Sequence, residues 1–374
     1  MKNIFLKILF IFFLTISLLF LIEFISKIFV DAKMNETVYA YVPSKPLAFK
    51  NDNTFEIIKK QFDGSCKNKI SKIIYDGNFP TYDSNWSCGG ATFENGTRLT
   101  LPRVETNSDT NKILMFGGST LWSPGVTDHN TIPSMIQKEL QSKNFVVLNY
   151  GFSTVVAKQQ ANKLKTTKLK KNDIVVFYDG FNDFWQSSML GNPNGTIIGY
   201  NQKNKISAFI VNIKFWLSNN SSFYNLLAQI KNDEKDKNSL KKCTVSSELA
   251  TRNAEKFWKV YVENLDEARK YTLKNEAKFL HILHPNLFSH RDLTNYEKGL
   301  RKLRACYSEA QDAYELYYLK VRKFLKNQPW HIDLSRELKR QNFYFDHAHL
   351  SAKGNQILSI KIIQNSKFQK AIQK

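Results

Sequence analysis

Cysteine is scarce in this 374-residue chain, which contains four, and no two of them form a Cys-x-x-Cys pair. The closely spaced cysteines that zinc sites and thioredoxin-like redox sites use are therefore missing. The seven histidines also form no cluster with cysteine or carboxylate residues that would predict a metal centre. We therefore expect an activity that needs neither a metal nor a cofactor.

The sequence also lacks the signatures of nucleic-acid-binding domains, although its formal net charge is +21. No RRM, KH, zinc-finger or helix-turn-helix pattern accompanies the 54 basic residues. The lysines are scattered along the chain beside many Asn, Ile and Phe residues, as is typical of the composition of an AT-rich genome. We expect no nucleic-acid partner. A hydrophobic content of 42% excludes a disordered chain.

The N-terminus contains one long apolar run, from Ile8 to Ile22, which resumes after Glu23. Lysines precede the run, and its length suits a membrane-spanning segment with a cytoplasmic N-terminus. We interpret residues 1–32 as an uncleaved signal anchor of the bacterial inner membrane, with the remainder of the chain on the periplasmic side. The alternative is a secreted protein, because Val30-Asp31-Ala32 fits a signal-peptide cleavage site.

An even number of cysteines in an exported protein predicts two disulfides, for which three connectivities exist. Proximity in the sequence favours Cys66–Cys88 and Cys243–Cys306. The alternative is that all four residues are reduced, buried thiols.

Lys112–Trp122 carries the first chemical signal in the chain. Four consecutive apolar residues, Ile113–Phe116, predict a strand that is buried on both faces, as in a parallel sheet. The strand ends in Gly117-Gly118-Ser119-Thr120, whose glycines allow a tight turn and leave no side chain over the serine. Residues 131–141 then show a helical period. Ser119 is therefore expected at the carboxyl end of a strand, where open α/β sheets bind ligands.

Strand and helix patterns alternate from Lys112 onward, which predicts a doubly wound parallel α/β sheet. The apolar runs that predict strands are 112–116, 145–149, 173–178, 278–283 and 331–334. The segments that predict helices are 131–141, 155–169, 257–272, 296–325 and 352–363.

We divide the chain into three parts. Residues 1–32 form the anchor. Residues 33–110, which are polar and rich in turn signals such as Gly89-Gly90, form a stalk and an N-terminal extension stapled to the main domain. Residues 111–374 form the main domain, with a helical or irregular insertion at about 186–251 that is rich in Asn, Ser and Lys.

Polar residues gather at the carboxyl ends of the predicted strands. Ser119 follows the first strand, Gly151 follows the second, and Asn182 follows the third. Asp346 and His349 come just before the last predicted helix. Each motif has an ordinary alternative as a turn, a loop or a helix cap. Their combined placement favours a common site.

These residue types suit acyl transfer to a serine. A serine hydroxyl is a weak nucleophile until a base removes its proton, and a histidine in that role needs a carboxylate to orient it. Asp346 and His349 are three residues apart, so one short loop can present both. The backbone N–H groups of Ser119 and Gly151, with the side-chain amide of Asn182, would form an oxyanion hole.

The same stretches resemble the sequence blocks of the SGNH (GDSL-like) hydrolase family. The four letters of the family name fall on Ser119, Gly151, Asn182 and His349. The resemblance implies a three-layer, flavodoxin-like fold and a serine esterase with the catalytic triad Ser119, Asp346 and His349.

One position departs from the family pattern, because Gly118 replaces the aspartate of Gly-Asp-Ser. Membrane-anchored and exported branches of the family often carry this Gly-Gly-Ser form. The resemblance covers about 111–200 and 278–365, and it does not extend to 1–110 or to the insertion.

Four aromatic residues beside these blocks are candidates for an acyl or sugar platform, with core packing as the alternative: Trp122, Phe152, Phe184 and Trp185. Among the other histidines, His347 is the alternative base, but it has the wrong spacing from Asp346. We expect His281 to be packed in the core and His284 to approach the cleft.

The leading hypothesis is an exported, membrane-anchored serine esterase that removes acetyl or other short acyl groups from a cell-envelope glycan. Its partners would be that acylated glycan and the membrane, which it would contact through the N-terminal helix. The alternatives are an O-acyltransferase that acts on an envelope polysaccharide, a lipid esterase, and a non-catalytic glycan-binding or assembly protein.

Overall fold

The computed structural model describes residues 10–26, 57, 60–61, 66, 73–76, 79–195, 223, 243, 245–289, 292–302, 306–338 and 342–373. The chain divides into two compact units. One comprises Met1–Ala40 and Ile198–Lys242, and the other comprises Tyr41–Ile197 and Cys243–Lys374.

The described part of the first unit is mainly a helix over residues 10–26. Apolar side chains of this helix, such as Phe10 and Phe20, are exposed. Near its end, Glu23 accepts a hydrogen bond of 3.2 Å from the backbone N–H of Phe223. Within the described residues, no helix combines the length and the apolar character needed to cross a membrane. The other residues of the predicted anchor 1–32, namely 1–9 and 27–32, lie outside the described residues.

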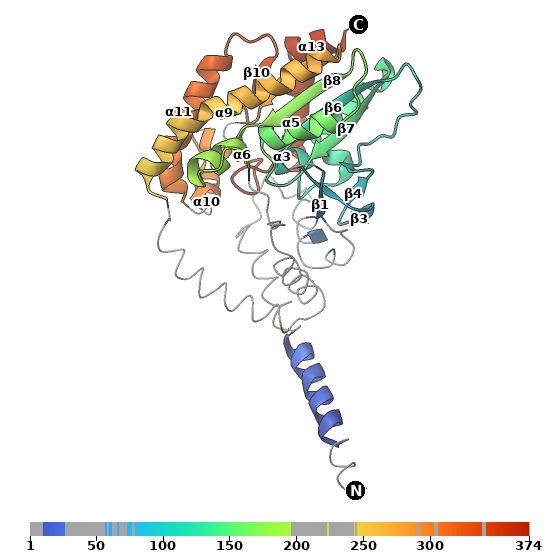
Figure 1. Cartoon of the computed structure of the whole chain (residues 1–374), viewed down its shortest axis with the longest axis vertical. Coiled ribbons are helices and arrows are strands. Elements are labelled where there is room, and N and C mark those ends of the chain that lie inside the picture. The colour runs from blue at the N-terminus through green and yellow to red at the C-terminus, as the bar shows by residue number, and fades with distance from the viewer. Residues whose placement is uncertain are drawn as a thin grey trace. The chain divides into compact units, whose positions relative to one another are not determined.

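The second unit is built on a sheet of eight strands, five of which are parallel and lie side by side from one edge of the sheet (Figure 1). The parallel strands lie in the order β10-β9-β8-β6-β7. Numbered along the chain, this is the flavodoxin-like order read from the other edge. Their bounds are Asn111–Gly117 for β6, Phe145–Gly151 for β7, Ile174–Asp179 for β8, Lys278–Leu283 for β9 and His331–Asp333 for β10. The predicted doubly wound sheet is confirmed.

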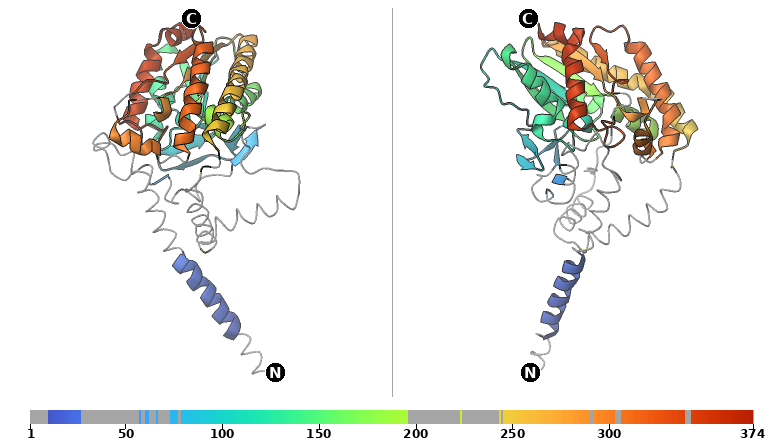
Figure 2. Two further views of the ribbon diagram at one scale, coloured as in Figure 1. Left: turned by 90° about the vertical axis from the view of Figure 1, so that its left-hand side faces the viewer. Right: turned by 180° about the vertical axis from the view of Figure 1, so that it is seen from behind.

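Alternate residues of each central strand pack against opposite helical layers. In β6, Leu114 and Phe116 pack on one face of the sheet, whereas Ile113 and Met115 pack on the other. The helices of the first face are α5 (Ala157–Thr166), α9 (Ser247–Lys274) and α11 (Tyr307–Leu325). Those of the second face are α4 (Ile132–Glu139), α12 (Ala352–Gln364) and α13 (Ser366–Ile372). Figure 2 shows the resulting three layers. The unalternated apolar runs in the sequence reflect this burial on both faces.

Three short antiparallel strands extend the sheet beyond β7: β5 (Thr97–Arg98), β4 (Ala91–Glu94) and β3 (Trp86–Cys88). The turn between β4 and β5 is Asn95-Gly96, and both residues have the positive φ that a two-residue hairpin favours. The strands β1 (Ile73–Asp76) and β2 (Phe79–Tyr82) form a separate antiparallel pair. Part of the predicted extension, 33–110, therefore belongs to the main sheet.

The two disulfides are Cys66–Cys88 and Cys243–Cys306, which are the pairings that sequence proximity favours. The second disulfide coincides with a break in a predicted helix. Instead of one helix over 296–325, the structure has α10 (Asn295–Lys302) and α11. Cys306 precedes α11 with a φ of 58°, which does not fit a continuous right-handed helix.

Residues at both ends of the predicted insertion, about 186–251, belong to elements of the second unit. The short helix α6 (Phe181–Phe184) continues into a π-helix, Trp185–Met189, whose last four residues are buried in the second unit. At the other end, α9 begins at Ser247. Apart from residues 190–195, 223, 243, 245 and 246, the rest of the insertion lies outside the described residues.

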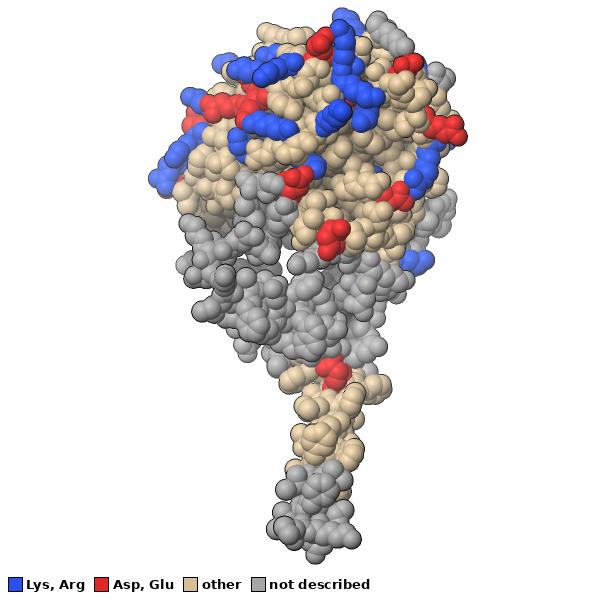
Figure 3. All heavy atoms as spheres, turned by 45° about the vertical axis from the view of Figure 1, so that its right-hand side comes forward, with Lys and Arg blue, Asp and Glu red and all other residues tan. Residues whose placement is uncertain are grey.

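The remaining short helices are α3 (Ser119–Trp122) and the 3₁₀ turns Asp128–Asn130, Gln141–Lys143 and Leu287–Ser289. On the described surface, Lys and Arg side chains are interspersed with Asp and Glu (Figure 3). Glu267, for example, contacts both Lys158 and Lys165. Some of the basic side chains are thus paired with acidic ones.

Candidate active site

Ser119 lies at the carboxyl end of β6, as the first residue of α3. The residue before it, Gly118, has no room for a side chain. A Cβ atom there would lie 2.3 Å from Nδ2 of Asn182. The Gly-Gly-Ser form thus lets the Asn182 amide approach the backbone directly before the serine.

Two of the three predicted oxyanion donors, the Ser119 N–H and the Asn182 amide, lie beside Gly118. The N–H of Ser119 belongs to the first turn of α3, where backbone donors have no partner within the helix. Asn182 donates one amide hydrogen to the carbonyl of Val155 at 3.0 Å, and its amide carries a second N–H. Both groups lie beside Gly118.

The third predicted donor, the N–H of Gly151, already has an acceptor. It donates to Oδ1 of Asn149 at 2.9 Å. A role of Gly151 in the oxyanion hole requires this hydrogen bond to break, and it stays a prediction. The Asn149 side chain was not assigned a role from the sequence, although it opens the Asn-Tyr-Gly turn.

The structure brings Asp346 and His349 together in the loop before α12. Nδ1 of His349 lies 2.6 Å from Oδ2 of Asp346. The other carboxylate oxygen accepts the backbone N–H groups of Ala348 and His349, each at 2.8 Å. Since the carboxylate accepts the Nδ1 hydrogen, the neutral imidazole has its lone pair on Nε2.

That Nε2 atom is the expected base of the reaction. It is buried and has no hydrogen-bond partner among the described residues. The structure therefore does not join Ser119 to His349 by a hydrogen bond. Catalytic hydrogen bonds are often long in ligand-free enzymes and shorten when substrate binds.

The surroundings of Asp346 keep its carboxylate ionised. Burial alone would raise the pKa of Asp346. The positive charges of protonated His349 and His347, with hydrogen bonds from His349 and the Ala348 N–H, outweigh that effect and hold the pKa well below its usual range. The anion is thus available to stabilise a protonated imidazole.

His284 also lies beside the nucleophile, as expected from its position after β9. Its Nε2 atom is 3.3 Å from Oγ1 of Thr120, the residue after Ser119. Its Nδ1–H donates to the carbonyl of Pro285 at 3.0 Å. Burial lowers the pKa of His284 to about 4, so it accepts a hydrogen bond as a neutral imidazole at neutral pH.

His347 has a different environment from its neighbour His349. Its ring packs 5.3 Å from that of Phe181, and its carbonyl accepts the N–H of Leu287. In the described structure it is His349 that contacts the Asp346 carboxylate. This arrangement favours His349 over His347 as the base.

A second Asp–His pair, Asp179 and His281, is buried at the carboxyl end of β8. Oδ1 of Asp179, at the end of β8, lies 2.5 Å from the hydroxyl of Tyr261 and 3.1 Å from Nε2 of His281. The Nδ1 atoms of His281 and His331 are 2.8 Å apart. His281 is fully buried. The expectation that it is packed in the core is confirmed.

The four candidate platform residues differ in exposure. Phe184 is buried and packs against Tyr314 and Tyr317, so it belongs to the core and cannot contact substrate. Phe152 is also buried. Trp122 and Trp185 are partly exposed and remain candidates.

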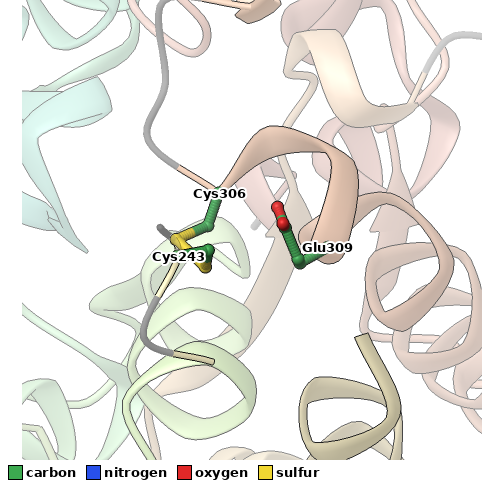
Figure 4. Close-up of side chains that lie close together, drawn as sticks. All are labelled: Cys243, Cys306 and Glu309. Atoms are coloured by element: carbon green, nitrogen blue, oxygen red, sulfur yellow. A yellow bond between two sulfur atoms is a disulfide. The ribbon is translucent and has the colours of Figure 1, made fainter. Parts of the chain in front are cut away.

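One group of potential metal ligands occurs among the described residues: Cys243, Cys306 and Glu309 (Figure 4). The two sulfur atoms are bonded to each other in a disulfide. Neither is a thiolate, the form that binds metals. This group is therefore a structural cross-link before α11.

No protein-family model and no curated protein matches the sequence. Several solved structures are similar to it. A member of the lipolytic G-D-S-L protein family from Veillonella parvula is 11% identical, covers 68% of this chain and 97% of its own, and has a TM-score of 0.38.

A GDSL-like lipase from Bacteroides thetaiotaomicron is 10% identical over 72% of this chain and 93% of its own, with a TM-score of 0.35. An acetyl xylan esterase is 16% identical over 67% and 97%, with a TM-score of 0.32. We argue the activity of this chain from the residues of its own site.

Proposed function

We propose that this protein is a serine esterase of the SGNH type. Ser119 is the nucleophile, His349 is the general base and acid, and Asp346 orients the imidazole. The Ser119 N–H and the Asn182 amide are the oxyanion donors, and each such donor contributes about 2.7–4 kcal/mol of transition-state stabilisation.

The reaction proceeds through an acyl-enzyme. Nε2 of His349 removes the Ser119 hydroxyl proton while Oγ attacks the ester carbonyl. The tetrahedral intermediate collapses, the C–O bond to the alcohol breaks, and His349 returns the proton to the leaving oxygen. His349 then deprotonates a water molecule, whose oxygen attacks the acyl carbon. The bond from that carbon to Oγ breaks, the acid leaves, and His349 returns the proton to Oγ of Ser119.

One observation carries this proposal: the Asp346–His349 pair leaves Nε2 buried, unpartnered among the described residues and free to accept a proton. The neutral His284 beside Thr120 connects the nucleophile turn to the loop after β9.

The class of substrate follows from the compartment in which the protein works. Two disulfides suit an oxidising, extracytoplasmic environment. We therefore propose an O-acetyl or other short acyl ester on a cell-envelope glycan as the substrate. Anchoring through residues 1–32 is part of this proposal and rests on the apolar run in the sequence.

The test uses the full-length protein with a fluorophosphonate probe and p-nitrophenyl esters of increasing chain length. We expect the probe to label Ser119, as located by mass spectrometry, and acetate to be released faster than octanoate. Ser119→Ala should abolish labelling and lower kcat on the order of 10⁵- to 10⁶-fold.

Ser153→Ala is the matched control, because Ser153 is an exposed serine two residues after Gly151. It should be labelled and turn over ester like the wild type. Full activity of Ser119→Ala would exclude the mechanism. Folded wild-type protein without labelling would favour the non-catalytic glycan-binding alternative, and acyl transfer to an added glycan in place of hydrolysis would favour the transferase.

A further inference from the structure

Arg98 is the most deeply buried cation among the described residues that contact the site, with a relative exposure of 0%. It lies on β5, in the extension that the family resemblance does not cover. Its Nε atom donates to Oδ1 of Asp128 at 2.9 Å. Its two terminal nitrogens donate to backbone carbonyls, and these belong to Trp122, Ser123 and Val126.

Those carbonyls belong to the turn that ends α3, the helix that begins with Ser119. The helix has only four residues, and Ser123 follows it with a φ of 59°. Carbonyls at the end of a helix have no partner within it and need donors from elsewhere. Here one guanidinium satisfies three carbonyls within eight residues of the nucleophile.

Two further positions of the extension, Gln61 and Gly90, contact the same turn. The Gln61 side chain accepts the N–H of Gly125 at 2.8 Å and donates to the carbonyl of Gly89 at 3.0 Å. The N–H of Asp128 donates to the carbonyl of Gly90 at 2.9 Å. Three separate segments of the extension therefore bind the turn through hydrogen bonds.

An aromatic cluster fills the space between the extension and the site loops. It is defined by Tyr82, Trp86, Phe93, Phe152 and Trp122. Trp86 and Phe93 stack at 5.1 Å, and Phe93 lies 6.5 Å from Trp122. The Arg98 guanidinium itself lies 5.9 Å from the centre of the Trp122 ring. Trp122, the last residue of α3, thus packs against side chains of the extension.

We propose that Arg98 is a positioning residue for the esterase reaction. It holds the turn after α3, and through it the direction of the Ser119 side chain and backbone N–H. This inference rests on the proposed function. Through Arg98, the extension would therefore contribute to the geometry of the active site.

Lysine cannot replace Arg98 in this role. The guanidinium is planar and offers five donors in a fixed fork, which here reach four acceptors. A lysine keeps the charge and the aliphatic stem but has three donors on one atom. Arg98→Lys therefore separates the geometry of the contacts from the presence of a buried cation.

The experiment compares full-length wild type, Arg98→Lys and the control Arg103→Met. Arg103 is on the same segment, but its side chain is 64% exposed and pairs with Glu94. Active-site titration with the fluorophosphonate probe gives kcat per functional site. For Arg98→Lys we expect kcat and the labelling rate to fall about 10- to 100-fold, with KM changed less than about twofold. Arg103→Met should match the wild type.

Amide hydrogen exchange supplies a readout that does not depend on activity. In Arg98→Lys, exchange should accelerate at least about tenfold in residues 119–128, while amides of β8 keep their wild-type protection. A role in global stability alone would accelerate exchange throughout the second unit. Wild-type kcat in folded Arg98→Lys, or a loss of activity with uniform acceleration of exchange, would overturn the proposal.

If Arg98→Lys does not fold, Asp128→Asn carries the test. It keeps the guanidinium and removes its charged partner, so we expect kcat to fall between about 2- and 10-fold in the same direction. Wild-type kcat would then overturn the proposal. If Ser119→Ala is as active as the wild type, the proposed function fails, and exchange in residues 119–128 alone decides whether Arg98 holds this turn.

Discussion

Two Asp–His pairs lie in the same unit of this protein, and their carboxylates behave in opposite ways. Asp346 and His349 are 2.6 Å apart in a loop, and Asp179 and His281 are 3.1 Å apart in the core. The pKa of Asp346 is held below its usual range, whereas burial raises the pKa of Asp179 to about 7. The distance between the two residues therefore does not identify a catalytic pair.

The donors around each carboxylate explain the difference. Asp346 accepts two backbone N–H groups in addition to the imidazole. Asp179 contacts a tyrosine hydroxyl and an imidazole, and hydrogen bonds from Tyr261 and Gln160 only partly offset the effect of its burial. Burial lowers the pKa of His281 to about 3, so this imidazole stays neutral. The loop pair is built to carry charge, and the core pair is built to avoid it.

The largest effect should come from neutralising each carboxylate in turn. We expect Asp346→Asn to lower kcat about 10³- to 10⁴-fold, because the imidazole loses the group that fixes its tautomer. Asp179→Asn should lower kcat less than about tenfold, since an amide resembles the protonated acid that burial favours there. Steady-state ester hydrolysis measures both. Equal losses in the two variants would mean that the core pair takes part in the reaction.

Tyr261→Phe, which alters the core pair, should lower stability and leave turnover unchanged. The Tyr261 hydroxyl contacts both Asp179 and His281, and its loss leaves two buried polar atoms short of a partner. We expect the free energy of unfolding to fall by about 1–3 kcal/mol, with kcat within twofold of the wild type. Urea unfolding measures the first quantity.

Tyr271→Phe is the matched control on the same helix, because its hydroxyl donates to the carbonyl of Lys165 at an exposed position. It should change the free energy of unfolding by less than about 0.5 kcal/mol. A loss of the same size in both variants would contradict the account of the core pair.

The smallest expected effect is that of the Asp179–His281 pair on the pH dependence of the unfolding free energy. Between about pH 4 and pH 6.5, folded Asp179 holds a proton and folded His281 does not, whereas the unfolded chain holds that proton on the imidazole. Both states bind one proton, so the pair adds no slope to the pH dependence of stability.

His281→Asn should reveal the contribution of Asp179. A carboxyl whose pKa is raised on folding contributes stability that is full below its unfolded pKa and is lost as pH rises through about 7. Relative to the wild type, the variant should therefore gain about 1 kcal/mol in unfolding free energy per unit of pH decrease between pH 6.5 and pH 4. Urea unfolding across this range measures the difference, and parallel curves would contradict it.

The sequence predicted both ends of each of the five parallel strands to within two residues. Runs such as Ile174–Phe177 in β8 are apolar because both faces of the sheet are covered, and β9 has the predicted bounds, 278–283. The break at Cys306 was not predictable, because the apolar period of α10 continues in register into α11. A positive φ at one residue leaves no trace in such a period.

The site was predictable where its residues lie close together in the chain. Asp346 and His349 are three apart, so their contact is local. Arg98 is different: its carbonyl acceptors lie 24 to 28 residues further along the chain. The burial of a cation in a two-residue strand depends on those distant groups, and the strand alone gives no signal of it. The Asn149 bond to the Gly151 N–H was missed because a turn asparagine has many ordinary partners.

The pairing of β5 with β7 has a further consequence for the solubility of the chain. Without β3, β4 and β5, a shortened chain that began at β6 would expose β7 as an unpaired edge. Its backbone would then lose the partner Arg98 at Asn149, whereas the Gln137 side chain would still bond the Phe145 carbonyl and the Val147 N–H. By covering β7 at Asn149, the extension therefore limits pairing of this edge with other chains.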